Sequence, residues 1–91
     1  MTTSNDDYEA GLDEKPRKAL QLLRANPDKP HSVMDIYGIV YTEEEKSAHR
    51  ESSGGSVEAF REIQRWLDGF REKGHVTSKI ISAQVYYLAT K

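Results

Sequence analysis

Arg61, Gln64 and Arg65 are the residues whose types and spacing best fit a recognition chemistry. On a helix the two arginines lie one turn apart, and the glutamine lies at the edge of the same side. A guanidinium fork fits O6 and N7 of guanine and an amide fits adenine, so the three side chains could contact DNA bases and phosphates. An alternative stays open, because carboxylates on this side would make it an ordinary solvated helix face. These carboxylates are Glu58, Glu62, Asp68 and Glu72.

The loop before this segment supplies a second candidate contact. Ser53, Gly55 and Ser56 belong to a Ser/Gly run over residues 52–56 that cannot continue a helix, so a helix must begin directly after it. The free N–H groups and the dipole at that helix start could hold a DNA phosphate. Ser56 is also expected to act as a plain N-cap, and the two roles are compatible.

Other chemistries have little support in the sequence. No cysteine is present, and His31, His49 and His75 are scattered without the i,i+4 pairing of a zinc site, so we expect no metal and no cofactor. No serine, histidine and acid combine with the spacing of a known catalytic motif. We therefore expect a protein that is not an enzyme.

Length and charge limit the class further. The chain has 91 residues, of which 36% are hydrophobic, which suits one domain with a modest core. Residues 15–91 carry all 13 Lys and Arg side chains and 10 of the 15 carboxylates, so this part is mildly basic and permits phosphate binding. We find no apolar run of membrane-spanning length and no secretory signal at the start. The expectation is a soluble, cytoplasmic protein.

The periodicity predicts helices followed by two strands. Asp13 and Pro16 suit the start of a first helix, which Pro27 must end near Asn26. The spacing of apolar residues is most regular in residues 57–73, which end before Gly74. The expected elements are a disordered acidic tail over residues 1–11, helices over about 13–26, 33–41, 43–51 and 57–73, and two strands within 75–91.

This order of elements resembles the winged helix-turn-helix superfamily over about residues 13–91. The resemblance rests on a long helix that ends in Arg71-Glu72-Lys73-Gly74-His75-Val76 and on the β-ribbon after it. It implies an α+β fold, a three-helix winged helix-turn-helix over residues 12–91 with a C-terminal β-hairpin as its wing. Residues 42–56 would then be an insertion between the second and third helices.

The resemblance also implies a function. Residues 57–73 would be the recognition helix of a transcriptional regulator that binds double-stranded DNA, and Lys79 would be the basic residue near the tip of the wing. The alternative is a winged helix that binds other proteins and not DNA, because a fold alone does not determine function.

Apolar residues on two faces of the last strand predict self-association. Tyr86 and Leu88 face away from Val85, Tyr87 and Ala89, and one small core cannot cover both sides. Leu22 offers a second surface, since it lies well around the first helix from its apolar stripe. We therefore expect a homodimer through Leu22, Tyr86 and Leu88, unless the tail or the insertion covers Tyr86 within the monomer.

Overall fold

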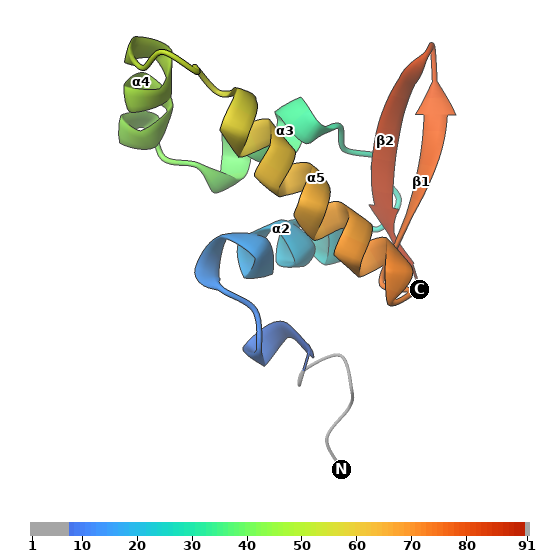
Figure 1. Ribbon diagram of the computed structural model, residues 1–91. Helices are drawn as coiled ribbons and strands as arrows, with labels where there is room; N and C mark the ends of the chain where they lie inside the picture. The colour runs from blue at the N-terminus through green and yellow to red at the C-terminus, as the bar shows by residue number, and fades with distance from the viewer. Residues whose placement is uncertain (1–7, 91) are drawn as a thin grey trace.

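The computed structural model describes residues 8–90, which form a bundle of helices followed by an antiparallel hairpin (Figure 1). A helical turn covers residues 8–10. The further elements are α2 (Glu14–Ala25), α3 (Val33–Val40), α4 (Glu43–Glu51), α5 (Val57–Glu72), β1 (Val76–Ile81) and β2 (Gln84–Ala89). The α+β class and the C-terminal hairpin predicted from the sequence are confirmed. In Figure 1, α5 runs between α4 at one end of the molecule and the hairpin at the other.

Local capping explains where α3 and α4 begin. Ser32 accepts a hydrogen bond from the Asp35 N–H, and the Asp35 carboxylate accepts one from the Ser32 N–H. Thr42 and Glu45 form the same reciprocal pair at the start of α4. Each pair satisfies two N–H groups that a helix start otherwise leaves without partners. The predicted helix over residues 43–51 is therefore confirmed.

The core forms around one face of α5. Ala59, Ile63, Leu67 and Phe70 are its buried residues, spaced three or four apart so that they share a side of the helix. They pack with apolar residues of α2, α3 and the hairpin, which are Ala19, Leu20, Leu23, Ile36, Val40, Tyr41, Val76, Tyr87 and Ala89. Because this face is covered, the opposite face of α5 is left to solvent. No helix in the described part is both long and apolar enough to cross a membrane.

The hairpin is attached to the helices at both of its strands. β1 and β2 pair in the register Val76↔Ala89 to Ile81↔Gln84. His31, between α2 and α3, forms an isolated bridge with Tyr87, with backbone N···O distances of 3.0 and 2.8 Å. The Arg71 guanidinium of α5 donates to the Ser78 hydroxyl at 3.3 Å. These contacts place the hairpin beside α5 and the start of α3.

The turn of the hairpin holds two residues in the left-handed region. Ser82 has φ 52° and Ala83 has φ 67°, which is the pattern of a type I′ turn that favours Asn-Gly. We expect Ser82→Asn with Ala83→Gly to raise the free energy of unfolding by about 1 kcal/mol, because both replacements relieve backbone strain. Urea denaturation measures this change. Ala83→Val is the control of opposite sign, since a β-branched residue is poorly tolerated there, and a destabilising Asn-Gly pair would contradict the prediction.

The prediction of a disordered tail is wrong for residues 8–11, which contact the rest of the molecule. Tyr8 stacks on the His75 ring with 4.2 Å between centroids, and Glu9 forms an ion pair with Arg24. Arg17 donates to the Glu9 carbonyl at 3.1 Å. The composition of residues 1–11 could not indicate these contacts, because their partners lie eight or more positions away. The rest of the predicted tail, residues 1–7, lies outside the described residues.

Candidate nucleic-acid interface

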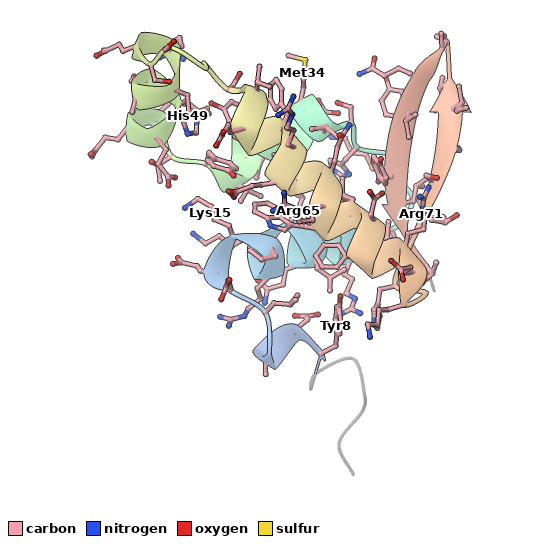
Figure 2. All side chains as sticks on the ribbon, viewed as in Figure 1. Tyr8, Lys15, Met34, His49, Arg65 and Arg71 are labelled. Atoms are coloured by element: carbon pink, nitrogen blue, oxygen red, sulfur yellow. The ribbon has the colours of Figure 1, made fainter. Side chains whose placement is uncertain are left out.

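The three residues proposed to contact bases lie together on α5. Arg61, Gln64 and Arg65 are exposed and line one shallow depression, together with Asp68, Gly69 and Glu72. Arg65 projects from the middle of α5, and Arg71 from its C-terminal end (Figure 2). The placement follows from the burial of Ile63 and Leu67, because residues at the intervening positions of a helix face outward. The structure therefore brings this part of the predicted site together.

Neither arginine is neutralised by a carboxylate of the described residues. In residues 8–90, Arg61 and Arg65 make no ion pair or side-chain hydrogen bond. Asp68 instead lies 3.6 Å from Arg71, which also holds Ser78. Two guanidinium groups and two carboxylates nevertheless share the depression, so the surface is mixed in charge. Such a surface fits the reading of base edges by individual side chains better than general attraction to phosphates.

The start of α5 differs from the prediction. Ser56 occupies the N-cap position, but its hydroxyl makes no capping hydrogen bond, because its backbone (φ −91°, ψ 7°) lacks the extended conformation that directs an N-cap side chain to the helix amides. The predicted N-cap position is therefore confirmed, but the expected side-chain cap is not formed. Gly55 has φ 59°, and Ser53 is exposed. Glu58 and Glu62 line the hollow beside this loop and oppose a phosphate there.

Lys79 is not part of the α5 surface. It pairs with Tyr86 in the hairpin register, next to the pair formed by Ser78 and Tyr87. Tyr87 is buried, and successive strand residues face opposite sides, so Lys79 lies on the hairpin face that points away from the core. The structure thus does not join Lys79 to Arg61 and Arg65.

The residues expected at a dimer interface are partly covered within the monomer. Leu22 packs against the core, and Tyr86 and Leu88 are half-buried. The exposed apolar side chains of the hairpin are instead Ile80 (73% exposed), Ile81 (40%) and Val85 (42%). Val85 lies on the core-facing side of β2, as predicted. It stays exposed because the end of the hairpin extends beyond the helices, which sequence periodicity cannot show.

The histidines lie in separate surroundings. His31 is buried beside Tyr87, and the His49 ring nitrogen lies 2.8 Å from the Tyr37 hydroxyl. Among residues 8–90 no group of three His, Cys, Asp or Glu side chains could hold a metal ion.

Protonation of the His75 ring should lower the stability of the folded protein. Its pKa is lowered from the ordinary 6.5 by burial, then by the Arg24 and Lys73 charges, while Glu9 acts in the opposite direction. Arg24 lies 3.0 Å from His75 Nδ1, and because a guanidinium only donates, the neutral ring must accept.

We expect the stability contribution of neutral His75 to be complete above pH 6.5 and to decrease as the pH falls from 6.5 through the lower folded-state pKa. The unfolded chain takes up the proton first, so acid favours unfolding. His75→Phe keeps a ring beside Tyr8 and removes this component. Thermal denaturation between about pH 7.5 and about pH 5.5 compares the two proteins, and an identical pH slope would contradict the assignment.

Comparisons with family models, with curated proteins and with solved structures find no match for this chain. Functional assignment therefore depends on the geometry of the molecule itself.

Proposed function

We propose that this protein is a regulator that binds double-stranded DNA, with α5 as its recognition helix. The observation that carries the proposal is the exposure of Arg61, Gln64 and Arg65 on one side of α5, without an ion pair for either arginine in residues 8–90. An arginine held in an internal ion pair must lose that partner before it contacts a base. These two arginines have no such partner to lose.

The order of elements supports the same proposal. Helices α2 and α3 pack on the buried face of α5, and the hairpin follows directly after it, a layout compatible with a winged helix. The exposed face of a helix mounted in this way is free to enter the major groove, which is wide enough for one helix. Helix α4 would be an insertion at one end of the molecule, where Figure 1 shows it projecting from the other helices.

A titration against random-sequence duplex DNA at several salt concentrations tests the proposal. Each phosphate neutralised by Lys or Arg contributes about −0.9 to the slope of log affinity against log salt. We expect a slope of about −3 or steeper, since two arginines and at least one flanking cation would lie near the backbone. The absence of duplex binding at low salt would refute DNA binding.

A second candidate function is supported by apolar residues near the hairpin. A groove of about 310 Å³ lies between the hairpin and the helices, lined by Val33, Met34, Gln64, Ala83, Gln84, Val85 and Tyr87. Met34 is 66% exposed, and Ile80 lies in the neighbouring strand, opposite Val85. Exposed apolar side chains gathered at one place favour contact with protein. The occupant would be a partner protein or a second copy of this chain.

For the second copy, we expect a dimer at tens of micromolar that Ile80→Glu with Val85→Glu abolishes. Two buried carboxylates without partners would cost several kcal/mol at such an interface. Sedimentation equilibrium measures the mass, and Ile39→Glu, at an exposed position outside the lining of this groove, is the matched control. A wild-type monomer would refute the homodimer. A dimer that survives the hairpin changes but not Tyr86→Glu with Leu88→Glu would restore the interface predicted from the sequence.

A further inference from the structure

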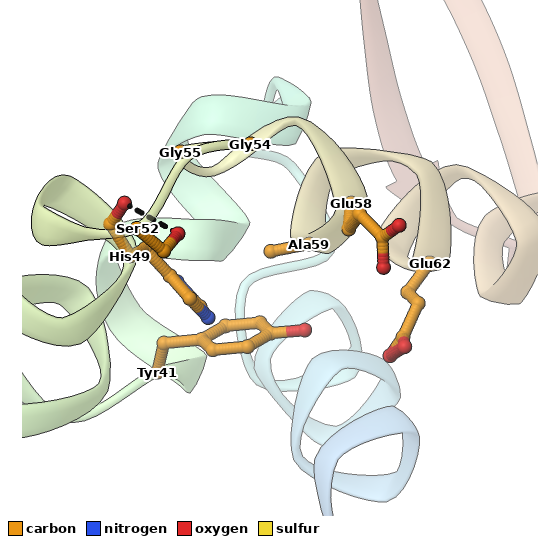
Figure 3. Close-up of a pocket in the computed structure, with 8 residues that line it drawn as sticks. All are labelled: Tyr41, His49, Ser52, Gly54, Gly55, Glu58, Ala59 and Glu62. Atoms are coloured by element: carbon orange, nitrogen blue, oxygen red, sulfur yellow. Dashed lines mark hydrogen bonds between the residues drawn. The ribbon is translucent and has the colours of Figure 1, made fainter.

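A hollow of about 370 Å³ lies where α3, α4 and the start of α5 meet, apart from the exposed arginines (Figure 3). We call it the α4–α5 pocket; its lining residues are Tyr41, His49, Ser52, Gly54, Gly55, Glu58, Ala59 and Glu62. Its size lies within the range of small-molecule sites in proteins. The pocket is thus larger than a single ion or water molecule requires.

Two carboxylates without partners give the pocket its charge. Glu58 and Glu62 lie one helical turn apart, and neither forms an ion pair or side-chain hydrogen bond within residues 8–90. The nearby Glu45 differs, since Lys15 holds it at 2.6 Å and keeps the pKa of that carboxyl at about 2. Glu58 lies in the first turn of α5. The pocket therefore attracts a cation.

Tyr41 adds a further polar group to the pocket. The residue is only 7% exposed, and its hydroxyl, which keeps some accessible surface, has no hydrogen-bond partner in the described part of the chain. In Figure 3 the hydroxyl points to the side of the pocket on which the Glu58 and Glu62 carboxylates lie. Burial and then the Glu62 charge raise the pKa of Tyr41 to about 12, so the phenol is neutral and its oxygen can accept a hydrogen bond.

Two aromatic rings line one side of the pocket. The Tyr41 and His49 rings lie with centroids 5.6 Å apart, and the Lys15 ammonium lies 5.3 Å from the Tyr41 ring centroid. Because Lys15 already lies over the Tyr41 ring, the ring offers little of its face to a ligand, and the groups left to a ligand are the Tyr41 hydroxyl and the two carboxylates. A metal ion is a poor fit, since residues 8–90 offer no set of three His, Cys, Asp or Glu ligands.

We propose that the α4–α5 pocket binds the guanidinium group of arginine or of an arginine derivative. A planar guanidinium can donate to the Glu58 and Glu62 carboxylates, which a single ammonium matches less well. Its remaining N–H groups reach the Tyr41 hydroxyl oxygen. This inference does not depend on DNA binding by α5.

An NMR titration of the full chain with L-argininamide tests the proposal. We expect saturable shifts at Tyr41, Glu58 and Glu62 with a Kd on the order of 1 mM. L-citrullinamide, which carries a neutral urea in place of the guanidinium, is the control ligand and should bind at least about tenfold more weakly. Equal binding of the two ligands, or shifts elsewhere only, would overturn the proposal.

Variants identify the groups that bind. Glu58→Gln with Glu62→Gln should weaken binding of L-argininamide by more than about tenfold, and Tyr41→Phe, which keeps the packed ring, by about threefold to tenfold. Glu72→Gln removes a carboxylate from another side of the same helix and should have no effect. If Glu72→Gln weakened binding as much as the pocket variants, the assignment of the ligand to the α4–α5 pocket would be wrong.

A capped tripeptide, acetyl-Gly-Arg-Gly-amide, distinguishes the two sources of the guanidinium. Binding of the tripeptide as tight as that of L-argininamide would support the side chain of a partner protein. Binding of L-argininamide alone would support a free small molecule enclosed by the pocket. Binding of neither compound would refute the guanidinium site.

Discussion

Replacing both Arg61 and Arg65 with alanine is expected to weaken duplex binding by about 30-fold to 10,000-fold. An arginine that contacts a base contributes about 1–3 kcal/mol, and the two positions lie one turn apart on the exposed side of α5. The variant should also show a shallower dependence of affinity on salt, since fewer counterions are released. Fluorescence anisotropy with a labelled duplex at several salt concentrations measures both quantities.

The control for this experiment removes the same charge elsewhere. Arg50 and Lys29 are exposed, on α4 and in the turn after α2, and within residues 8–90 the Arg50 side chain hydrogen-bonds to Ser47 alone. Arg50→Ala with Lys29→Ala should reduce affinity far less than the α5 variant. An equal loss would mean that net charge, and not α5, determines binding. Unchanged binding by the α5 variant would place the DNA on another surface.

Gln64 separates recognition of bases from attraction to phosphates. It carries no charge, so Gln64→Ala leaves the number of released counterions unchanged. If it contacts adenine, its loss alters the preference among duplex sequences while the salt dependence stays constant.

The elements with local signals were predicted well from the sequence. Thr42 with Glu45 defines the start of α4 because both partners of the capping box lie within four positions of each other. Pro27 ends α2 at Ala25 through its effect on the preceding residue. The outward position of Arg61 and Arg65 follows from the helical period of the apolar residues between them.

The features that sequence analysis missed depend on contacts between distant residues. Tyr8 is held by His75, far along the chain, so the composition of the first eleven residues could not indicate it. His31 joins the hairpin through backbone atoms, which carry no side-chain signal. The α4–α5 pocket requires Tyr41 and Glu62 to meet across two helices, and the sequence analysis took Glu62 as part of a solvated face.

The largest expected effect on stability comes from Ile63→Ala, in the centre of the buried face of α5. Ile63 is completely buried, so the change removes packed methyl groups and leaves a cavity between α5 and its neighbours. Such changes cost about 2–5 kcal/mol. A domain of this size has a free energy of unfolding of roughly 5–15 kcal/mol, so the variant would lose a large share of its stability. We expect a decrease in the melting temperature of about 10–30 °C.

Ile39→Ala is the matched control, since it makes the same chemical change at a position that is 61% exposed. Little apolar area is buried there, so the free energy of unfolding should change by no more than about 0.5 kcal/mol. Urea denaturation of both variants by circular dichroism gives the two values. Equal effects at the two positions would contradict the arrangement in which α5 turns Ile63 to the core and Arg61 and Arg65 to solvent. The DNA-binding proposal depends on the same arrangement. This comparison therefore tests, without any ligand, whether α5 presents Arg61 and Arg65 to solvent.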